Sequence, residues 1–197
     1  MIKTTMFTTS VYEKTNFLNK YEIEKLNNII EKNQTFKEHK YLIGNAVSSY
    51  DHENQFLDNV VDIKKEIQKE INVCSKMISY DSIELTNSWS NIQRKGSSIK
   101  YHCHPNSIVS GVLFLEVDEH SSKIYFKNPN QMLLNCDFKE NNSDNFEYFF
   151  IVPQPGMLLM WPSWLMHGSN DDINNSEKRT VISFNTFYKK NKGKGRG

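Results

Sequence analysis

Residues Tyr101 to Val117 read YHCHPNSIVSGVLFLEV, and this stretch decides the fold. Its second half is rich in β-branched and aromatic residues, which is typical of a buried β-strand. Its first half places His102 and His104 one residue apart. On an extended backbone alternate side chains share a face, so both imidazoles should point the same way while Cys103 points into the packing behind. Because two imidazoles on one face can bind one metal ion, the stretch predicts a metal site at the entrance to a β-core.

The chain on both sides of this stretch has the pattern of a mainly β protein. Apolar residues recur with period two in seven runs, Ile83–Arg94, Ile99–His102, Ile108–Val117, Lys123–Phe126, Phe146–Val152, Met157–Trp161 and Arg179–Tyr188. Short strands bounded by Gly, Pro and Asn, with no helical pattern between them, predict a β-sandwich or barrel. The long polar loop Asn130–Asn145 is a candidate lid or a plain insertion, and the pattern leaves both open.

Two amphipathic helices precede the predicted strands. Apolar residues at helical spacing predict the first over Lys20–Asn33, after a sequence of capping-box type, and the second over Leu57–Ile78. Between them lies a polar stretch, Gln34–Gln55, without a clear period. His39 and His52 in this stretch have no partner at ligand spacing, and we expect solvent-exposed loop histidines.

The length and composition indicate a single domain. The chain has 197 residues, and we assign 1–188 to one domain with its β-core at 82–188, followed by a flexible basic tail at 189–197. The net charge of +1 gives no signal for nucleic acid or an anionic membrane. Three scattered cysteines without C-x-x-C spacing, and the lack of a run long and apolar enough to cross a membrane, predict a cytoplasmic location.

Two further candidates lie near the C-terminus. His167 follows a predicted strand and could be a third metal ligand, although a structural histidine in a turn has the same pattern. The alternation of RTVISFN places Arg179, Ser183 and Asn185 on one face of an otherwise apolar strand. A buried guanidinium must be satisfied, and a carboxylate ligand, an internal acidic partner or a solvent-facing surface would each satisfy it.

Several motifs together resemble a family of 2-oxoglutarate- and Fe(II)-dependent oxygenases of bacteria and their phages, related to the prolyl 4-hydroxylase-like superfamily. The motifs, in chain order, are WSN at 89–91, HCHPNS at 102–107, SGV at 110–112, FKNP at 126–129, PGMLLMWPSWLMH at 155–167 and RTVISFN at 179–185. The resemblance covers essentially the whole chain, since FTTSVYEK at 7–14 is similar to the opening strand of the family.

The resemblance implies a double-stranded β-helix, or jelly roll, with two flanking N-terminal helices, that binds Fe(II), 2-oxoglutarate and O₂. His102 and His167 match the two histidine ligands, and Arg179 matches the arginine that binds the distal carboxylate of 2-oxoglutarate. Ser183 and Asn185 match positions near that arginine. The implied reaction hydroxylates a substrate and releases succinate and carbon dioxide.

His104 departs from the wider superfamily, which has Asp or Glu at this position. Three imidazoles leave the metal more positive and suit Zn, Cu, Fe and Ni alike. Asp118 and Glu119 could supply a carboxylate, but they lie in a predicted turn where solvated charge is normal.

The pocket and its ligand are less defined by the sequence. Asn91, Tyr101 and Ser110 are candidate pocket residues, with packing or strand-edge hydrogen bonding as their alternative. The substrate could be a small molecule or a peptidyl group. The rival function is a non-oxidative, cupin-like jelly roll that uses the same histidines to recognise a carboxylated or carbohydrate ligand, and a purely structural zinc site is a third reading.

Overall fold

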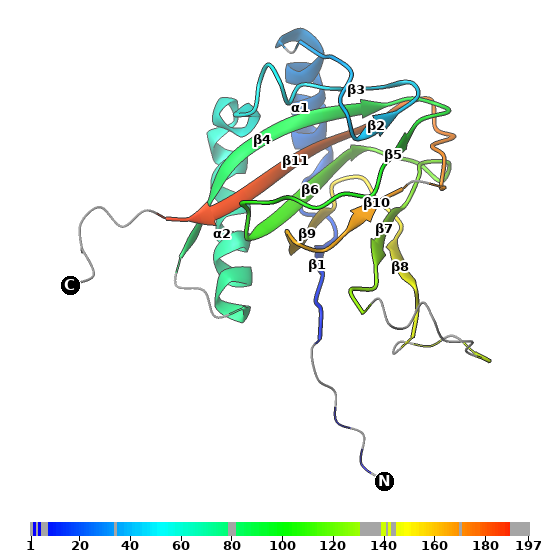
Figure 1. Cartoon of the computed structure of the whole chain (residues 1–197). Helices are drawn as coiled ribbons and strands as arrows, with labels where there is room; N and C mark the ends of the chain where they lie inside the picture. The colour runs from blue at the N-terminus through cyan, green and yellow to red at the C-terminus, as the bar shows by residue number, and fades with distance from the viewer. Residues whose placement is uncertain are drawn as a thin grey trace.

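The computed structural model describes residues 2, 4, 8–33, 35–78, 82–130, 139–140, 142, 145–169 and 171–189. The predicted loop at 130–145 lies mostly outside these residues, and so does the basic tail after residue 189. The described chain is mainly β-structure with helices on one side, as Figure 1 shows. The predicted mainly β fold with two N-terminal helices is confirmed.

The largest sheet has six strands in the order β1-β9-β6-β11-β4-β3. These strands are β1 (Tyr12–Lys14), β9 (Leu158–Pro162), β6 (Val109–Glu116), β11 (Arg179–Tyr188), β4 (Ile83–Gln93) and β3 (Ala46–Ser48). All pairings are antiparallel. The two long strands β4 and β11 lie side by side in this sheet (Figure 1), and residues of both face the interior of the molecule.

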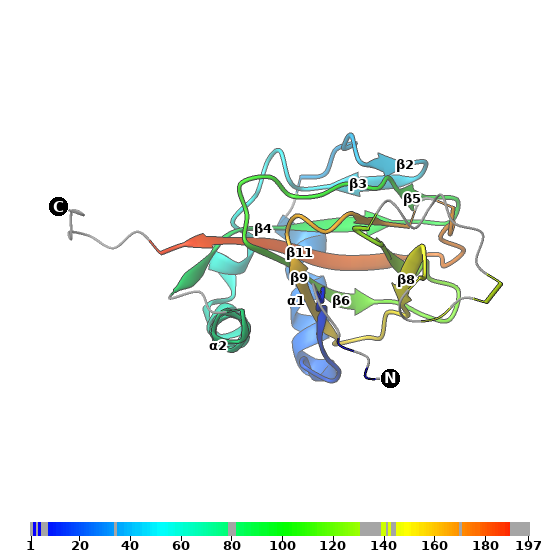
Figure 2. The ribbon, with the colours of Figure 1, turned by 60° about the horizontal axis from the view of Figure 1, so that its bottom comes forward.

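The opposite wall is a smaller sheet with the order β10-β7-β8. It consists of β10 (His167–Gly168), β7 (Ile124–Lys127) and β8 (Tyr148–Ile151). An isolated antiparallel bridge joins His102 to His167 and extends this sheet by one residue. A two-stranded sheet of β2 (Leu42–Ile43) and β5 (Ser98–Ile99) lies beside it. Figure 2 shows β8 of the small sheet near one end of the long strands of the large sheet. Side chains of both sheets form one apolar core between them, as in a jelly roll.

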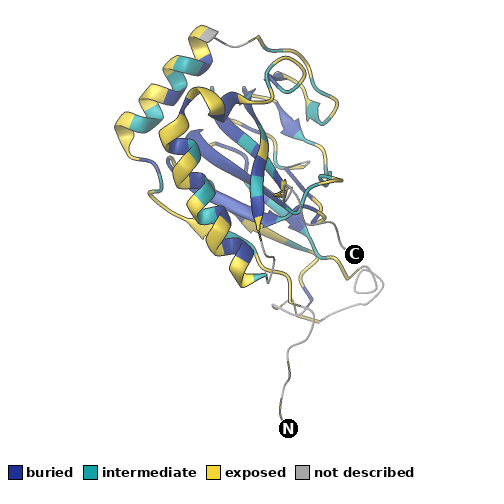
Figure 3. Cartoon of the chain, turned by 90° about the vertical axis from the view of Figure 1, so that its left-hand side faces the viewer, coloured by how far each residue is buried: buried dark blue, intermediate teal, exposed yellow. Residues whose placement is uncertain are grey.

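The helices cover the outer face of the large sheet. Helix α1 (Lys20–Asn33) and helix α2 (Val61–Met77) turn their buried residues toward the sheet and their exposed ones outward, as Figure 3 shows. At the start of α1, Asn19 and Glu22 exchange backbone and side-chain hydrogen bonds of 2.9 and 3.0 Å, which forms the predicted capping box. The predicted bounds of the first helix are confirmed.

Strand alternation divides the apolar side chains into two cores. Leu113, Ile182 and Phe184 pack against the helices on one face of the large sheet. Val112 and Val181, their neighbours in sequence, pack between the two sheets with the side chains of the small sheet. Because successive residues face opposite sides, one continuous apolar strand can contribute to both cores.

Some predicted bounds are wrong. The second helix was expected from Leu57, but residues Phe56–Asn59 form a short 3₁₀ helix, η1, and the α-helix begins after Val60. The buried side chain of Leu57, whose N–H donates to Ser88 Oγ, docks this turn on β4 and prevents a continuous helix. The strand predicted at Ile99–His102 is only the two-residue β5, and the polar stretch Gln34–Gln55 contains β2 and β3.

Among the described residues, no helix is long and apolar enough to span a membrane.

Candidate active site

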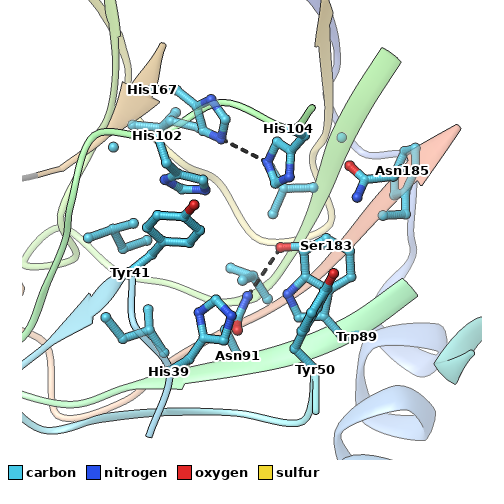
Figure 4. A pocket seen from close by; sticks show the side chains of 18 of the residues that line it. His39, Tyr41, Tyr50, Trp89, Asn91, His102, His104, His167, Ser183 and Asn185 are labelled. Carbon is cyan, nitrogen blue, oxygen red and sulfur yellow. Dashed lines mark hydrogen bonds between the residues drawn. The ribbon is translucent and has the colours of Figure 1, made fainter. Parts of the chain in front are cut away.

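Three histidines from two distant parts of the chain converge at the mouth of the jelly roll. One ligand nitrogen from each of His102, His104 and His167 lies within 4.8 Å of the other two. Mutual backbone hydrogen bonds of 3.0 Å between His102 and His167 hold the first and third together. The backbone N–H of His104 donates to the carbonyl of Ser163 at 2.9 Å, which fixes the second. Figure 4 shows the three rings turned toward one another.

Hydrogen bonds and burial prepare these rings to bind a cation. Nδ1 of His102 lies 2.8 Å from the carbonyl oxygen of Lys100, and Nδ1 of His167 lies 2.9 Å from that of Leu165. A carbonyl can only accept, so Nδ1 carries the proton in both rings and Nε2 keeps its lone pair.

Burial also keeps the rings neutral. Desolvation is the main cause that lowers the pKa of all three histidines, and the neighbouring rings add to it: the pKa of His104 falls to about 3 and that of His167 falls well below its usual value. Neutral imidazole is the form that binds a metal, so the donor set fits a divalent transition ion.

The histidines line a cavity of about 370 Å³. Its floor is formed by β11 and β4 of the large sheet, from which Arg179, Ser183, Asn185 and Asn91 line it. The segment that follows α1, which includes His39 and Tyr41, forms another part of its wall. The structure therefore brings the predicted histidines, Arg179, and Ser183 and Asn185 of the same strand to one cavity. Figure 4 shows the three histidines, Ser183 and Asn185 around it.

Arg179 is 3% exposed, and its guanidinium lies 5.5 Å from the centre of the Phe114 ring. Nη1 donates to Oε1 of Gln93 at 2.5 Å, and within the described residues no acidic group forms an ion pair with it. Desolvation lowers the pKa of Arg179 to about 10, so the group stays charged at neutral pH. Of the three explanations that the sequence left open, burial excludes the solvent-facing surface. Asp172 is near enough to raise the pKa of Arg179, but among the described residues it forms no ion pair with the guanidinium.

Three buried N–H donors in this part of the site have no acceptor among the described residues. They are Nε of Arg179, Nε2 of Gln93 and Nε1 of Trp161. Arg179 and Trp161 line the cavity, and Gln93 is hydrogen-bonded to Arg179. A buried donor without an acceptor costs roughly 1–3 kcal/mol. Several such donors around a buried cation fit an anionic ligand, and a carboxylate meets this requirement.

A hydrogen-bonded group of serines supports the other end of the floor. Ser110 Oγ lies 2.8 Å from Ser163 Oγ and donates to Oδ1 of Asn185 at 2.7 Å. Ser163 Oγ also donates to Ser107 Oγ at 2.8 Å. Because Ser163 holds the backbone of His104 as well, this group connects the second histidine to the amide of Asn185.

Two expected pocket residues do not line the cavity. Tyr101 instead stacks on Tyr148 with ring centres 5.8 Å apart, and burial is the main cause that raises its pKa to about 12. Ser110 lies beneath the floor and acts on it through Asn185. Of the three candidates, Asn91 alone is in direct contact with the cavity.

The expectations for Cys103 and His39 are also wrong. Cys103 is half-buried and lines the cavity, because residues around His102 form an irregular segment with a single bridge rather than a strand that alternates strictly. His39 lines the cavity and is half-buried, whereas His52 is exposed as predicted. Asp118 and Glu119 lie exposed in a turn, away from the three-histidine group, also as expected.

Sequence reasoning missed several cavity residues. Trp161 lies against His167 with ring centres 4.7 Å apart and ring planes tilted by 59°, and Tyr41 stacks on His102 at 4.5 Å. Tyr50 and Trp89 line the cavity further along. Trp161 and Trp89 lie within motifs that carried the family resemblance, so that resemblance was the available signal for them. No local pattern distinguishes Tyr41 or Tyr50 from other tyrosines.

The fold and the site together define a metal-binding jelly roll with a buried arginine in its cavity. A model of the family described as "Putative 2OG-Fe(II) oxygenase" matches residues 87–185, which is half of the chain and contains every predicted site residue. The chain belongs to this family. It is an enzyme, an oxygenase that uses Fe(II), 2-oxoglutarate and O₂. A search of curated proteins finds no significant match.

Solved structures show the same fold at low sequence identity. HygX from Streptomyces hygroscopicus with nickel and 2-oxoglutarate bound has a TM-score of 0.64 at 11% identity and covers 93% of this chain and 84% of its own. An oxidoreductase of the 2OG-Fe(II) oxygenase family from Burkholderia pseudomallei has a TM-score of 0.66 at 9% identity, with 95% and 88% covered. A prolyl hydroxylase from Trichoplax adhaerens, in complex with a hypoxia inducible factor peptide fragment, has a TM-score of 0.63 at 12% identity, with 92% and 84% covered.

Proposed function

We propose that the enzyme hydroxylates a C–H bond of its substrate and that His102, His104 and His167 hold the iron while Arg179 binds the far carboxylate of 2-oxoglutarate. The observation that carries the proposal is the group of buried donors without an acceptor, on Arg179, Trp161 and Gln93, in or beside the cavity that the three histidines line. A dicarboxylate with one end near the histidines and the other near Arg179 satisfies these donors.

The chain's own residues have three tasks in this reaction. The histidines supply neutral nitrogen ligands, and backbone carbonyls fix the orientation of the His102 and His167 rings. Arg179 and Gln93 orient the cosubstrate by charge and hydrogen bonds.

The third task is to keep water out. Phe114, Trp161 and Val181, all buried, line this part of the cavity with apolar surface. When bound, the iron and 2-oxoglutarate activate O₂, so that one oxygen atom enters the substrate and the other enters succinate as carbon dioxide is released.

The family membership favours this oxidative function over the cupin-like alternative. The number of ligands argues against a purely structural zinc site. Structural zinc ions usually have four protein ligands, whereas the three histidines leave coordination positions open for other molecules.

Removing the guanidinium provides the test. An anaerobic titration of the apo-protein with Fe(II) and then 2-oxoglutarate should produce a weak visible metal-to-ligand charge-transfer band that needs both additions. In Arg179→Ala the band should require roughly 10- to 100-fold more 2-oxoglutarate, since a charge-assisted hydrogen bond contributes about 1.5–3 kcal/mol. Arg179→Lys keeps the charge but loses the two-pronged geometry and should give an intermediate affinity.

Arg94→Ala is the matched control, because Arg94 lies at the end of the same β4 region but is exposed. It should bind 2-oxoglutarate like the unmodified protein. An unchanged affinity in Arg179→Ala would refute the assignment of Arg179, and tight zinc binding without any band would favour the non-oxidative function.

A further inference from the structure

The cavity extends well beyond the part that the cosubstrate fills. Arg179, Ser183 and Asn185 lie on one face of β11, and the rise of roughly 3.3 Å per residue places Ser183 about 13 Å and Asn185 about 20 Å from Arg179 along the strand. A five-carbon dicarboxylate held by Arg179 is too short to reach Asn185. The sequence assigned all three residues to the cosubstrate, but this spacing favours a second ligand at the Ser183–Asn185 end.

Aromatic rings surround this second part of the cavity in a closed circle. In order around the circle the six residues are His102, Tyr41, His39, Tyr50, Trp89 and His104. The distances between the centres of successive rings, starting from His102 and returning to it, are 4.5, 5.5, 5.3, 4.9, 6.1 and 5.0 Å. We call this set the ring collar. Figure 4 shows it around the side chains of Asn91 and Ser183. Such a surface binds flat or apolar groups.

The floor inside the ring collar presents hydrogen-bond donors. Oδ1 of Asn185 accepts from Ser110, so its NH₂ group remains for a ligand. Ser183 Oγ accepts from Nδ2 of Asn91 at 3.2 Å, which leaves its own proton to donate. Both side chains line the cavity, about 7 Å apart along the strand. A ligand that satisfies them must carry oxygen or nitrogen acceptors.

The charges around the cavity oppose a cationic ligand. Among the described residues that line it are Lys40, Lys123 and Arg179, and none of these lining residues is acidic. Lys40 Nζ already lies 4.8 Å from the centre of the Tyr41 ring. An aromatic cage for a quaternary ammonium group would face these positive charges and the metal as well.

The volume limits what can enter. About 370 Å³ lies near the lower end of the usual range for ligand sites, roughly 300–1,000 Å³, and the cosubstrate occupies part of it. The remaining space fits a single small ring rather than a bulky scaffold.

We infer that the primary substrate presents an uncharged planar ring with carbonyl acceptors, the chemistry of a pyrimidine base, which stacks within the ring collar and accepts hydrogen bonds from Ser183 and Asn185. This inference rests on the proposed function, because it assigns the Arg179 end of the cavity to the cosubstrate. Thymine is the simplest probe, since it combines two ring carbonyls with a methyl group that offers C–H bonds.

Calorimetric titration of the Fe(II)- and 2-oxoglutarate-loaded protein without oxygen tests the inference. Thymine should bind more tightly than N-acetylprolinamide, which is not planar, and than choline, which is cationic. Trp89→Leu removes one ring of the collar, and Asn185→Asp keeps the acceptor for Ser110 but replaces the NH₂ donor by an acceptor. Each should weaken thymine binding roughly tenfold, the scale of losing one aromatic stacking partner in Trp89→Leu and one hydrogen bond in Asn185→Asp. Tyr21→Leu removes an exposed ring on α1 and should bind thymine like the unmodified protein.

The results separate failure of this inference from failure of the proposed function. If the charge-transfer band forms but thymine fails to bind, or binds no better than choline or N-acetylprolinamide, the inference is overturned and the proposed function stands. If the band does not form, the proposed function itself fails. Should Trp89→Leu not fold, Asn185→Asp still decides, because an undiminished affinity there overturns the inference. Comparison of thymidine with a short single-stranded oligothymidylate shows whether the ring comes as a free nucleoside or as part of a strand, and both results support the inferred chemistry.

Discussion

His104 is the residue whose chemistry distinguishes this site most clearly. Its Nε2 lies 3.2 Å from Nε2 of His167, so the two ring nitrogens point at the same space. In the proposed ligand set, which has a third imidazole in place of a carboxylate, the protein supplies no negative charge to a divalent ion. Carboxylate oxygen is a harder ligand than imidazole nitrogen, so this exchange should change which metals the site prefers.

Two substitutions of His104 test its role as a ligand. His104→Ala removes one of three ligands, and Fe(II) affinity should fall by more than the roughly 10- to 100-fold that the loss of an outer-shell partner usually causes. His104→Asp restores a carboxylate and should retain Fe(II) binding while it lowers the affinity for zinc relative to Fe(II). Competition titrations of the two metals against a chromophoric chelator measure both quantities. Equal metal affinities in the unmodified protein, His104→Ala and His104→Asp would show that His104 is not a ligand.

The sequence predicted which histidines meet at the cavity better than it predicted the rest of the cavity lining. The pair His102 and His104 stood out because of its spacing on an extended backbone. His167 and Arg179 were candidates from local pattern with open alternatives, and the family motifs then favoured their functional roles. The serine group beneath Asn185 and the aromatic side chains after α1 could not be predicted, because their roles depend on contacts between segments far apart in sequence. The predicted roles of Ser183 and Asn185 toward the cosubstrate remain predictions.

At the scale of elements, the side chain of Gln68 on α2 connects this helix to the N-terminal end of β4. Nε2 of Gln68 donates to the carbonyl of Ile83 at 3.0 Å, and its Oε1 accepts from the backbone N–H of Leu85, also at 3.0 Å. These two residues lie at the start of β4, next to Thr86, which is the extra β4 residue where the register with β11 shifts between Asn185 and Thr186. Gln68 therefore replaces strand-like hydrogen bonds at an irregular point of the sheet.

Gln68→Ala should lower the free energy of unfolding by about 1–3 kcal/mol, because it leaves a partly buried N–H and a carbonyl without partners. Urea unfolding followed by circular dichroism measures this change. Lys69→Ala, one position further along α2 and exposed, should have little effect. A loss no larger than that of Lys69→Ala would mean that water replaces both hydrogen bonds at no cost.

The accuracy of the element prediction followed the length and regularity of each segment. The first helix was predicted to the residue, and β11 likewise, since both have long, unbroken patterns and the helix has a capping box. The two-residue strands β2 and β10 contain too few residues for any period to be visible. The start of the second helix was wrong because docking of Leu57 on β4 overrides the local helical pattern.

At the scale of the whole molecule, the site brings together residues from different sheets, which backbone hydrogen bonds join to each other at few points. His167 belongs to the three-stranded sheet, His102 touches it through an isolated bridge, and Arg179 begins the strand β11 of the six-stranded sheet. A ligand set drawn from separate sheets does not exist in the unfolded chain. Metal binding and cosubstrate binding should therefore both stabilise the native state.

Thermal unfolding should reveal this coupling as two increases in Tm, a first step on addition of metal and a second step on addition of 2-oxoglutarate. Mn(II), a redox-stable substitute for Fe(II), at about 100 times its dissociation constant should add about 2.7 kcal/mol of stability. For a chain of this size that corresponds to a rise in Tm of roughly 5–10 °C. 2-Oxoglutarate should raise Tm further only when the metal is present, because one end of it needs the metal and the other needs Arg179. Arg179→Ala should keep the first step and lose most of the second, whereas His167→Ala, if folded by circular dichroism, should lose both. An equal Mn(II) shift in His167→Ala, or a 2-oxoglutarate shift without metal, would show that the ligands stabilise the protein somewhere other than this cavity.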